Sequence, residues 1–356
     1  MTTLPSMTIA VITYNSSSYI VDCLESLQKS GVADSALMIV DDCSPDDTCA
    51  IVRERFPDVR VVALDRNGGH SRACNQAIKA VETEWIVLVD HDTEVKEDWY
   101  EQMCAAVVRH PDAGGIVSRA IFHNDGETIH SDGGYAHYIG NMRLRNGYTK
   151  LAQAEQGEEE IGAAGTTAMA VNREKALECG LFDEDFFIYL NDFEFSLRLR
   201  LLRYKLISAP DAVIYHKGGS QGVSYRGDGR YPPMRAYYIL RNRWFMLLKL
   251  YQLKTLLLCA PPILLYELVL LAMSIQRGVI APYLKGGWWV LSHLGLILQA
   301  RKKTQALRVM GDAELLSAGN LSFVPDVVKA GFATRVKAGL DGFFNGYWNA
   351  VKGLLS

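Results

Sequence analysis

Short, continuously apolar runs alternate with amphipathic stretches over residues 7–117. Unbroken Val, Ile and Leu character in a short run is typical of a strand covered on both faces, as in a parallel sheet. Between these runs apolar residues recur at helical spacing, as Ile20, Leu24 and Leu27 do. The pattern predicts an α/β fold whose sheet is mostly parallel and doubly wound, with helices on both faces. The expected strands are 9–13, 37–40, 59–64 and 85–89.

The alternation stops at about Arg119. Residues 119–162 carry several glycines among polar side chains, which predicts a variable insertion of short hairpins that faces a ligand. Regular elements then return. We expect a strand at 168–171, helices at 173–179 and 192–202, and strands at 205–209 and 212–215 separated by a Pro210-Asp211 turn.

The composition changes again after Tyr231-Pro232-Pro233 and predicts two domains, 1–240 and 241–356. Residues 256–275 are long and apolar enough to cross a hydrocarbon core, but Pro261-Pro262 and Glu267 interrupt them. Residues 288–298 are too short to cross. They begin with two tryptophans and lead into a basic triplet, which is typical of a helix lying among lipid headgroups. We expect a helical, membrane-associated tail; a true span, a soluble cap or a dimer interface in a homo-oligomer are the alternatives.

Charge and cysteine content narrow the class of protein. The 37 basic and 40 acidic side chains give a net charge of −3, which disfavours nucleic acid as a partner. The seven cysteines form no Cys-x-x-Cys pair and are interpreted as reduced thiols. The first residues enter a strand without the pattern of a secretory signal. We therefore expect the chain at the cytoplasmic face of the inner membrane, peripheral or monotopic.

Two aspartates close the fourth expected strand, in Ile86-Val87-Leu88-Val89-Asp90-His91-Asp92. The carboxyl end of such a strand is where an open α/β sheet holds a divalent cation and a phosphorylated ligand. By itself an Asp-x-Asp pair is weak evidence, because it is more often two solvated turn residues after a strand. The ends of the neighbouring strands support the binding-site interpretation. Thr13-Tyr14-Asn15 and Asp41 would lie at the same edge and could bind a nucleotide base and ribose.

A glycine turn follows the third expected strand. Asn67-Gly68-Gly69, with Asn75 in the next helix, supplies a loop whose backbone amides could approach a donor closely. An ordinary strand-to-helix turn is the alternative.

The most specific motifs lie between Gly165 and Ser220. They are Gly180-Leu181-Phe182-Asp183-Glu184-Asp185-Phe186-Phe187-Ile188-Tyr189-Leu190-Asn191-Asp192-Phe193-Glu194 and Pro210-Asp211-Ala212-Val213-Ile214-Tyr215-His216-Lys217-Gly218-Gly219-Ser220. With these motifs, residues 7–245 resemble family 2 of the glycosyltransferases, the inverting enzymes of the GT-A fold. The resemblance is to the bacterial cell-surface polysaccharide branch, similar to rhamnosyltransferases.

The resemblance implies a role for individual residues. Asp41 would hydrogen-bond the nucleotide base, with the Thr13 region supporting the same pocket. Asp90 and Asp92 match the metal motif, in which the second carboxylate is the main ligand and the first also reaches the ribose. His216 would complete the metal coordination. Asp192 matches the catalytic base, and Arg198 the arginine of the same motif.

The chain departs from the family pattern at Asn191, where a glutamate is usual, at Glu194, where an aspartate is usual, and at Ala77, where a glycine is common. Asn191 and Glu194 flank the proposed base, and Ala77 lies on the phosphate side. Asp192 itself is present. Arg241-Asn242-Arg243-Trp244 is similar to the Gln-x-x-Arg-Trp box of processive synthases. Leu240 occupies the glutamine position, which favours single-sugar addition.

Two carboxylates and an imidazole suit Mn²⁺ or Mg²⁺. Such a cation neutralises the charge that develops on a nucleoside-diphosphate leaving group, while a carboxylate on the opposite side of the sugar accepts the acceptor proton. The expected substrates are a nucleoside-diphosphate sugar donor and a lipid-linked or oligosaccharide acceptor, with one displacement and inversion.

Other interpretations stay open at this point. The chain could be a sugar-phosphate nucleotidyltransferase or a catalytically silent scaffold. Asp192 could cap its helix, and His216 could be a satisfied strand-end histidine. Trp99 and the 225–231 loop could shape the acceptor site or simply pack.

Overall fold

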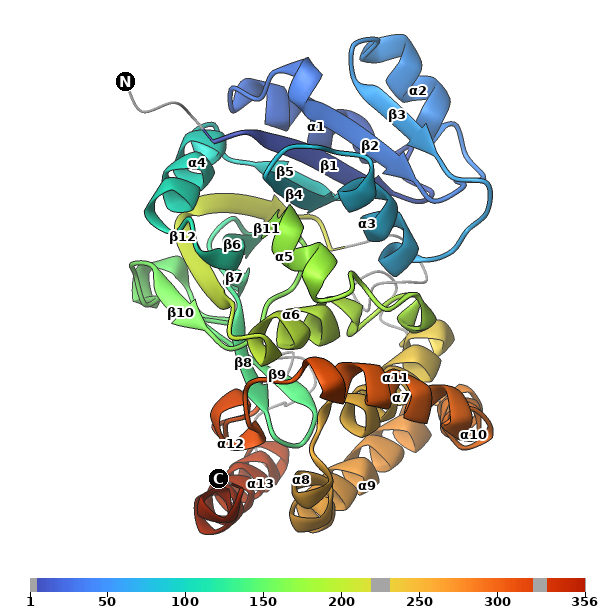
Figure 1. Cartoon of the computed structure of the whole chain (residues 1–356), viewed down its shortest axis with the longest axis vertical. Helices are drawn as coiled ribbons and strands as arrows, with labels where there is room; N and C mark the ends of the chain where they lie inside the picture. Colours follow the sequence, from blue (N-terminus) through green and yellow to red (C-terminus); the bar gives the residue numbers. More distant parts are fainter. Residues whose placement is uncertain (1–4, 219–230, 323–331, 356) are drawn as a thin grey trace.

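The computed structural model describes residues 5–218, 231–322 and 332–355. The amino-terminal part alternates strands and helices as the hydrophobic pattern predicts (Figure 1). Its elements are β1 Met7–Thr13, α1 Ile20–Lys29, β2 Leu37–Asp41, α2 Thr48–Arg55, β3 Arg60–Ala63, α3 His70–Lys79 and β4 Trp85–Asp90.

Short strands dominate the next part of the chain, and the predicted insertion contains the β8–β9 hairpin. The elements are β5 Thr93–Val95, α4 Trp99–Arg109, β6 Ala113–Phe122, β7 Ile129–Ser131, β8 Gly134–His137, β9 Asn141–Leu144, β10 Glu159–Ile161, β11 Ala168–Asn172, α5 Arg173–Glu178, the 3₁₀ turn η3 Glu184–Phe186, α6 Asn191–Leu201 and β12 Lys205–His216.

The main sheet has the order β10-β12-β6-β11-β4-β1-β2-β3, with β5 paired to β12 and β7 to β6. Strands β3, β2, β1 and β4 are parallel, as predicted. The other half is mixed, because β11 runs antiparallel to both β4 and β6. Parallel strands require a crossover connection, whereas the chain reaches β11 through the irregular insertion. The sheet is therefore less parallel than the sequence pattern predicts.

β12 corrects a second expectation. We predicted two strands separated by a Pro210-Asp211 turn, but residues 205–216 form one strand with a register shift between Ala209 and Val213. A bulge accommodates proline within a sheet without ending the strand. The continuous strand matters for the site, because it carries His216 to the edge where β4 ends.

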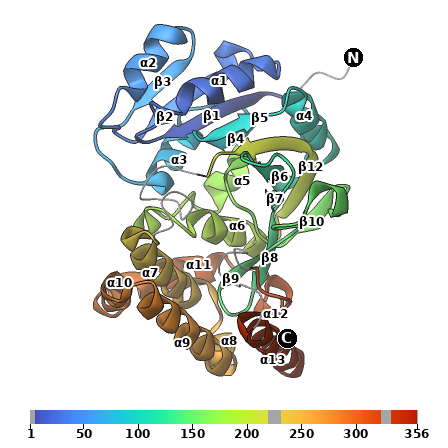
Figure 2. The same cartoon turned by 180° about the vertical axis from the view of Figure 1, so that it is seen from behind.

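Two apolar clusters cover the two faces of the sheet. Alternate residues of β4 enter different clusters: Val87 and Val89 face α1, α2 and α4, whereas Ile86 and Leu88 face α3, α5 and α6 (Figure 2). This alternation is what a strand covered on both faces requires. Trp99 belongs to the first cluster, where it is fully buried and its Nε1 donates to Ser118 Oγ at 2.9 Å. It is a core residue and does not shape an acceptor site.

The carboxyl-terminal helices gather at the end of the molecule opposite β1–β3 (Figures 1 and 2). A third apolar cluster joins them to α6, for example through Phe193, Leu197 and Phe245. The predicted domain boundary at residue 240 falls inside α7 and stays a prediction. The helices are α7 Pro233–Leu250, α8 Leu253–Leu258, α9 Ala260–Gln276, α10 Ile280–Ser292, α11 Leu294–Leu307, α12 Asp312–Leu315 and α13 Phe332–Val351.

The apolar stretch 256–275 is divided between α8 and α9, with Pro261 and Pro262 in the first turn of α9. Within the described part of the chain, no helix combines the length and the apolar character needed to cross a membrane. Glu267 accepts hydrogen bonds from Arg243 Nη1 at 2.6 Å and Trp244 Nε1 at 2.7 Å. The Arg-Trp pair that is similar to the box of processive synthases therefore binds the tail helices.

Candidate active site

Three strand ends meet at one edge of the sheet because of the parallel register. Thr13 pairs with Asp41, and Ile12 pairs with Asp90. Thr13 Oγ1 donates to Asp41 Oδ1 at 3.0 Å, and both side chains are buried. Tyr14 and Asn15 follow on the exposed side of this edge. The structure thus gathers the residues that we predicted for the donor pocket, and their contact with a nucleotide stays a prediction.

The glycine turn after β3 is held by a residue that the sequence analysis did not single out. Asp42 accepts the backbone N–H groups of Gly68 at 2.9 Å and of Gly69 at 2.7 Å. Burial raises the pKa of Asp42, and the two amides partly offset that rise. Gly69 has φ +83°, and a Cβ there would lie 2.5 Å from the ring of Phe187. These amides therefore hold a turn, which favours our structural alternative over direct contact with a donor; Asn67 beside them is exposed.

Asn75 also has a structural part. Its Nδ2 donates to Phe182 O and to Glu184 Oε1, both at 2.9 Å, and its Oδ1 accepts from Phe182 N at 2.8 Å. The side chain is buried, and its amide is fully used in fixing the segment before η3. We therefore do not carry Asn75 into the proposed donor site.

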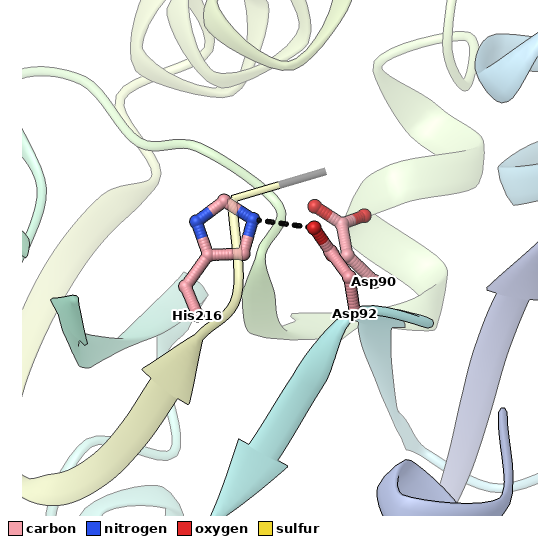
Figure 3. Close-up of side chains that lie close together, drawn as sticks. All are labelled: Asp90, Asp92 and His216. Atoms are coloured by element: carbon pink, nitrogen blue, oxygen red, sulfur yellow. Dashed lines mark ion pairs between the residues drawn. The ribbon is translucent and has the colours of Figure 1, made fainter. Parts of the chain in front are cut away.

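Asp90, Asp92 and His216 come together through the pairing of β5 with β12. The antiparallel register places His216 opposite Thr93, which is the residue that follows Asp92. Lys217 N also donates to Asp92 O at 2.9 Å. The ligand atoms of the three side chains all lie within 4.8 Å of one another, with the imidazole facing the two carboxylates (Figure 3). The predicted set is thus assembled from positions more than 120 residues apart.

The electrostatics and distances of this trio fit a divalent cation. His216 Nε2 lies 3.1 Å from Asp92 Oδ2, a buried atom that has ion-pair contact but no well-directed hydrogen bond. Burial opposes ionisation of Asp92, but the facing imidazole outweighs it and holds the pKa of the carboxyl well below its usual range. Adjacent ligands of an octahedral Mg²⁺ stand about 3 Å apart and opposite ligands about 4.2 Å, so the 3.1 Å contact fits two neighbouring ligands of one cation. Oxygen and imidazole donors suit Mg²⁺ or Mn²⁺.

Asp192 lies in the first turn of α6. Leu190 occupies the N-cap position, so Asp192 is not the N-cap residue, although its Oδ1 accepts from Phe193 N at 2.7 Å. Burial raises the pKa of Asp192 and Asp90 adds to this rise, while the hydrogen bond from Phe193 N and the charge of His70 oppose it. A Cβ at residue 165 would lie 3.2 Å from Asp192 Oδ2, so Gly165 leaves room for the carboxylate.

His70 links the metal motif to the helix of the proposed base. Its Nε2 lies 3.3 Å from Asp90 Oδ1, and its Nδ1 lies 2.9 Å from Asn191 Nδ2. In the sequence, the one signal for His70 is its place directly after the glycine turn. Asn191 stands where the family usually has a glutamate, and its side-chain amide contacts His70.

The segment before Asp192 is strained and is fixed by one residue of α7. Phe187, Tyr189 and Leu190 have φ values of +63°, +61° and +58°. Such conformations cost about 1–3 kcal/mol each for non-glycine residues and persist only where surrounding structure imposes them. Asn242 is fully buried, and its Nδ2 lies 2.8–2.9 Å from the carbonyl oxygens of Phe186, Ile188 and Tyr189. Asn242 therefore helps to set the position of Asp192.

Arg198 supports α6 from inside. It binds Glu194 with Nε at 2.8 Å and Nη2 at 3.0 Å, and its Nη1 donates to Cys179 O at 2.6 Å. Lys249 of α7 lies 2.7 Å from the same Glu194. Glu194 is thus buried, and it is held by ion pairs with Arg198 and Lys249. Of the 225–231 loop, only Tyr231 is within the described residues.

Comparison with known proteins finds a family match in the amino-terminal half of the chain. The sequence profile of Glycosyl transferase family 2 matches residues 8–180. The chain carries a family 2 glycosyltransferase domain. A relative from Mycobacterium tuberculosis, N-acetylglucosaminyl-diphospho-decaprenol L-rhamnosyltransferase, is 24% identical over 60% of this chain and 77% of its own length. Succinoglycan biosynthesis protein ExoO of Rhizobium meliloti is 40% identical over 31% of each chain, so this match spans less than a third of that relative.

Solved structures agree on the fold of this glycosyltransferase domain. S. aureus TarS 1-349 in complex with UDP has a TM-score of 0.51 at 20% identity, over 97% of this chain and 91% of that one. GalNAc-T7, crystallised with UDP, GalNAc and Mn²⁺, has a TM-score of 0.55 at 16% identity, over 74% of this chain and 52% of that one. These matches confirm the predicted GT-A fold. The family profile and the named relatives support the interpretation as a glycosyltransferase.

Proposed function

We propose that this chain is a metal-dependent, inverting glycosyltransferase. It moves one sugar from a nucleoside-diphosphate sugar to a hydroxyl group of a lipid-linked saccharide in cell-surface polysaccharide biosynthesis. The observation that carries the proposal is the convergence of Asp90, Asp92 and His216 at the same sheet edge as Thr13 and Asp41. The names of the M. tuberculosis and R. meliloti relatives support the acceptor class and the pathway class.

On the donor side, Asp41 and Thr13 would bind the base and ribose, with Tyr14 and Asn15 beside them. Asp90, Asp92 and His216 would hold Mn²⁺ or Mg²⁺, which when bound supplies positive charge against the diphosphate leaving group. Asp90 would also reach the ribose. Asp92 stays ionised in this setting because His216 depresses its pKa against the effect of burial.

On the acceptor side, Asp192 would accept the proton of the attacking hydroxyl. Burial raises the pKa of Asp192, which makes it a better base than an exposed aspartate. His70 and Asn191 hold this helix start against the metal motif, and Asn242 fixes the segment before it. One carboxylate and one displacement give inversion at the anomeric carbon.

A donor panel tests the proposal. UDP-, dTDP- and GDP-sugars are titrated into the protein with and without Mn²⁺, and slow hydrolysis of each donor is followed. We expect one donor to be selected and its binding to depend on the metal. Absence of binding to every donor under both conditions would favour the scaffold interpretation instead.

We also propose that the tail rests on an anionic membrane surface. Helices α8–α11 expose large apolar side chains, among them Leu257, Leu268, Trp288, Leu291 and Leu298, each at least 60% exposed. Residues 253–307 carry six lysines and arginines against the single acidic Glu267. An apolar helical face with basic side chains fits the headgroup region of an anionic bilayer.

Replacing both Trp288 and Leu291 by glutamate should weaken binding to phosphatidylglycerol vesicles by more than about tenfold, because burial of each side chain is worth about 1.5–3 kcal/mol. Vesicle co-sedimentation measures this. Val108→Glu is the matched control, since Val108 is an exposed apolar residue of α4. Equal binding of the double variant and the control would contradict attachment through this face.

A further inference from the structure

His216 is held from behind by a second histidine. His130 of β7 stacks on His216, with ring centroids 5.1 Å apart and an interplanar angle of 12°. Phe122 also stacks on His130, with ring centroids 5.0 Å apart, and Tyr148 stacks on Phe122 at 5.9 Å. The four rings form a column that ends at the proposed metal site. This arrangement arises because both β7 and β12 pair with β6 near its carboxyl end.

A ring nitrogen of each histidine also lies within hydrogen-bond distance of the other ring. His216 Nδ1 lies 3.1 Å from His130 Nδ1, while His216 Nε2 lies 3.1 Å from Asp92 Oδ2. Each nitrogen of His216 therefore has its own partner, and the ring cannot turn without losing both. A histidine that ligates a metal through Nε2 carries its proton on Nδ1, and the group that accepts this proton fixes the tautomer.

We propose that His130 is a positioning residue for the metal site. In the ligating state it accepts the Nδ1–H of His216 at its own Nδ1, so that the Nε2 lone pair of His216 faces Asp90 and Asp92. The proton of His130 is then on Nε2. This inference rests on the proposed metal dependence, but it concerns a contact within the chain that can be measured without metal.

Two substitutions separate hydrogen bonding from packing. His130→Phe keeps a stacked ring but has no acceptor for His216. His130→Asn loses the ring but keeps an oxygen close to the former position of Nδ1. A positioning role predicts that asparagine is the better replacement, whereas a packing role predicts phenylalanine. Asn also serves as the second variant should the Phe protein fail to fold.

Mn²⁺ alone is the first probe, titrated into the full chain and followed by EPR. We expect His130→Phe to weaken Mn²⁺ binding by about 10–100-fold, as loss of an outer partner of a metal ligand usually does, and His130→Asn to recover part of this loss. His110→Phe is the matched control, because His110 precedes β6 and pairs with Glu158 at the opposite end of that strand. Unchanged affinity in His130→Phe, or better binding by Phe than by Asn, would overturn the proposal.

The ring nitrogens of His216 provide a second readout in the metal-free protein. We expect the ¹⁵N resonances of His216 to move in His130→Phe and to stay in place in His110→Phe. If the wild-type protein binds no Mn²⁺, the proposed metal-dependent function is wrong. The ¹⁵N resonances of His216 still test the contact between His130 and His216 in that case. An unchanged His216 spectrum in His130→Phe would refute positioning, whatever the outcome for the metal.

Discussion

Asp192→Asn should leave donor binding intact and lower turnover by about 10²–10⁴-fold, the usual contribution of general-base assistance. Asparagine has nearly the same shape and can still accept from Phe193 N through its side-chain oxygen, so α6 should be preserved. It cannot take the proton of the acceptor hydroxyl. Steady-state kinetics with the donor that the panel selects, together with donor titration, would measure the two effects separately.

The pH profile of the wild-type enzyme gives a related readout. The base acts when ionised, so activity should rise with pH through the pKa of Asp192, and burial places this pKa above that of an ordinary aspartate. Asp211→Asn, at an exposed position in the bulge of β12, is the matched control and should keep full activity. An Asp192→Asn enzyme with near-normal turnover would remove this residue from the role of base.

Asp92→Ala should abolish measurable Mn²⁺ binding and the metal-dependent part of donor affinity. We expect Mn²⁺ affinity to fall by more than the roughly 10–100-fold that follows when a metal ligand loses its hydrogen-bond partner. The reason is that Asp92→Ala removes a proposed ligand together with its negative charge. Calorimetric titration of Mn²⁺ and of the selected donor in the presence of the metal would measure it.

Asp58→Ala, at an exposed site before β3, is the control for loss of one carboxylate. His216 loses its acidic partner in Asp92→Ala, so circular dichroism should accompany the titration to show that the fold is intact. Donor binding that stays equal in Asp92→Ala and Asp58→Ala would mean that the trio serves structure rather than the donor.

The sequence predicts best the half of the fold that depends on the local hydrophobic pattern, which is the half containing β1–β4. Strands β1–β4 are continuous apolar runs, and short connections leave few topologies for them. Orientation of β11 and continuity of β12 depend on pairing between distant segments, which one chain's periodicity does not display. For the same reason, the pattern predicted a mostly parallel sheet and a Pro210-Asp211 turn where the structure has a mixed sheet and a bulge.

The candidate site divides in a similar way. Asp90, Asp92 and Asp41 were visible as carboxylates at strand ends, whereas His216 and Asp192 were assigned through family motifs. Asp42, His70, His130 and Asn242 were not assigned to the site, because their significance comes from contacts across 26 to 121 residues of sequence and from pairing in the insertion. The glycine turn is the converse case, since its amides suggested either a ligand or an ordinary turn, and in the structure they donate to Asp42.

Helix α7 has a geometric consequence for the choice of acceptor. It packs on α10 and α11, whose outer side is apolar, and it also holds the carbonyl groups just before Asp192 through Asn242. In a protein seated on a bilayer through those helices, the proposed base Asp192 would stand at a fixed height above the lipid headgroups. An acceptor then reacts only if its hydroxyl reaches that height. The length of the lipid-linked saccharide would be selected by rigid packing, without any side chain that recognises the sugar itself.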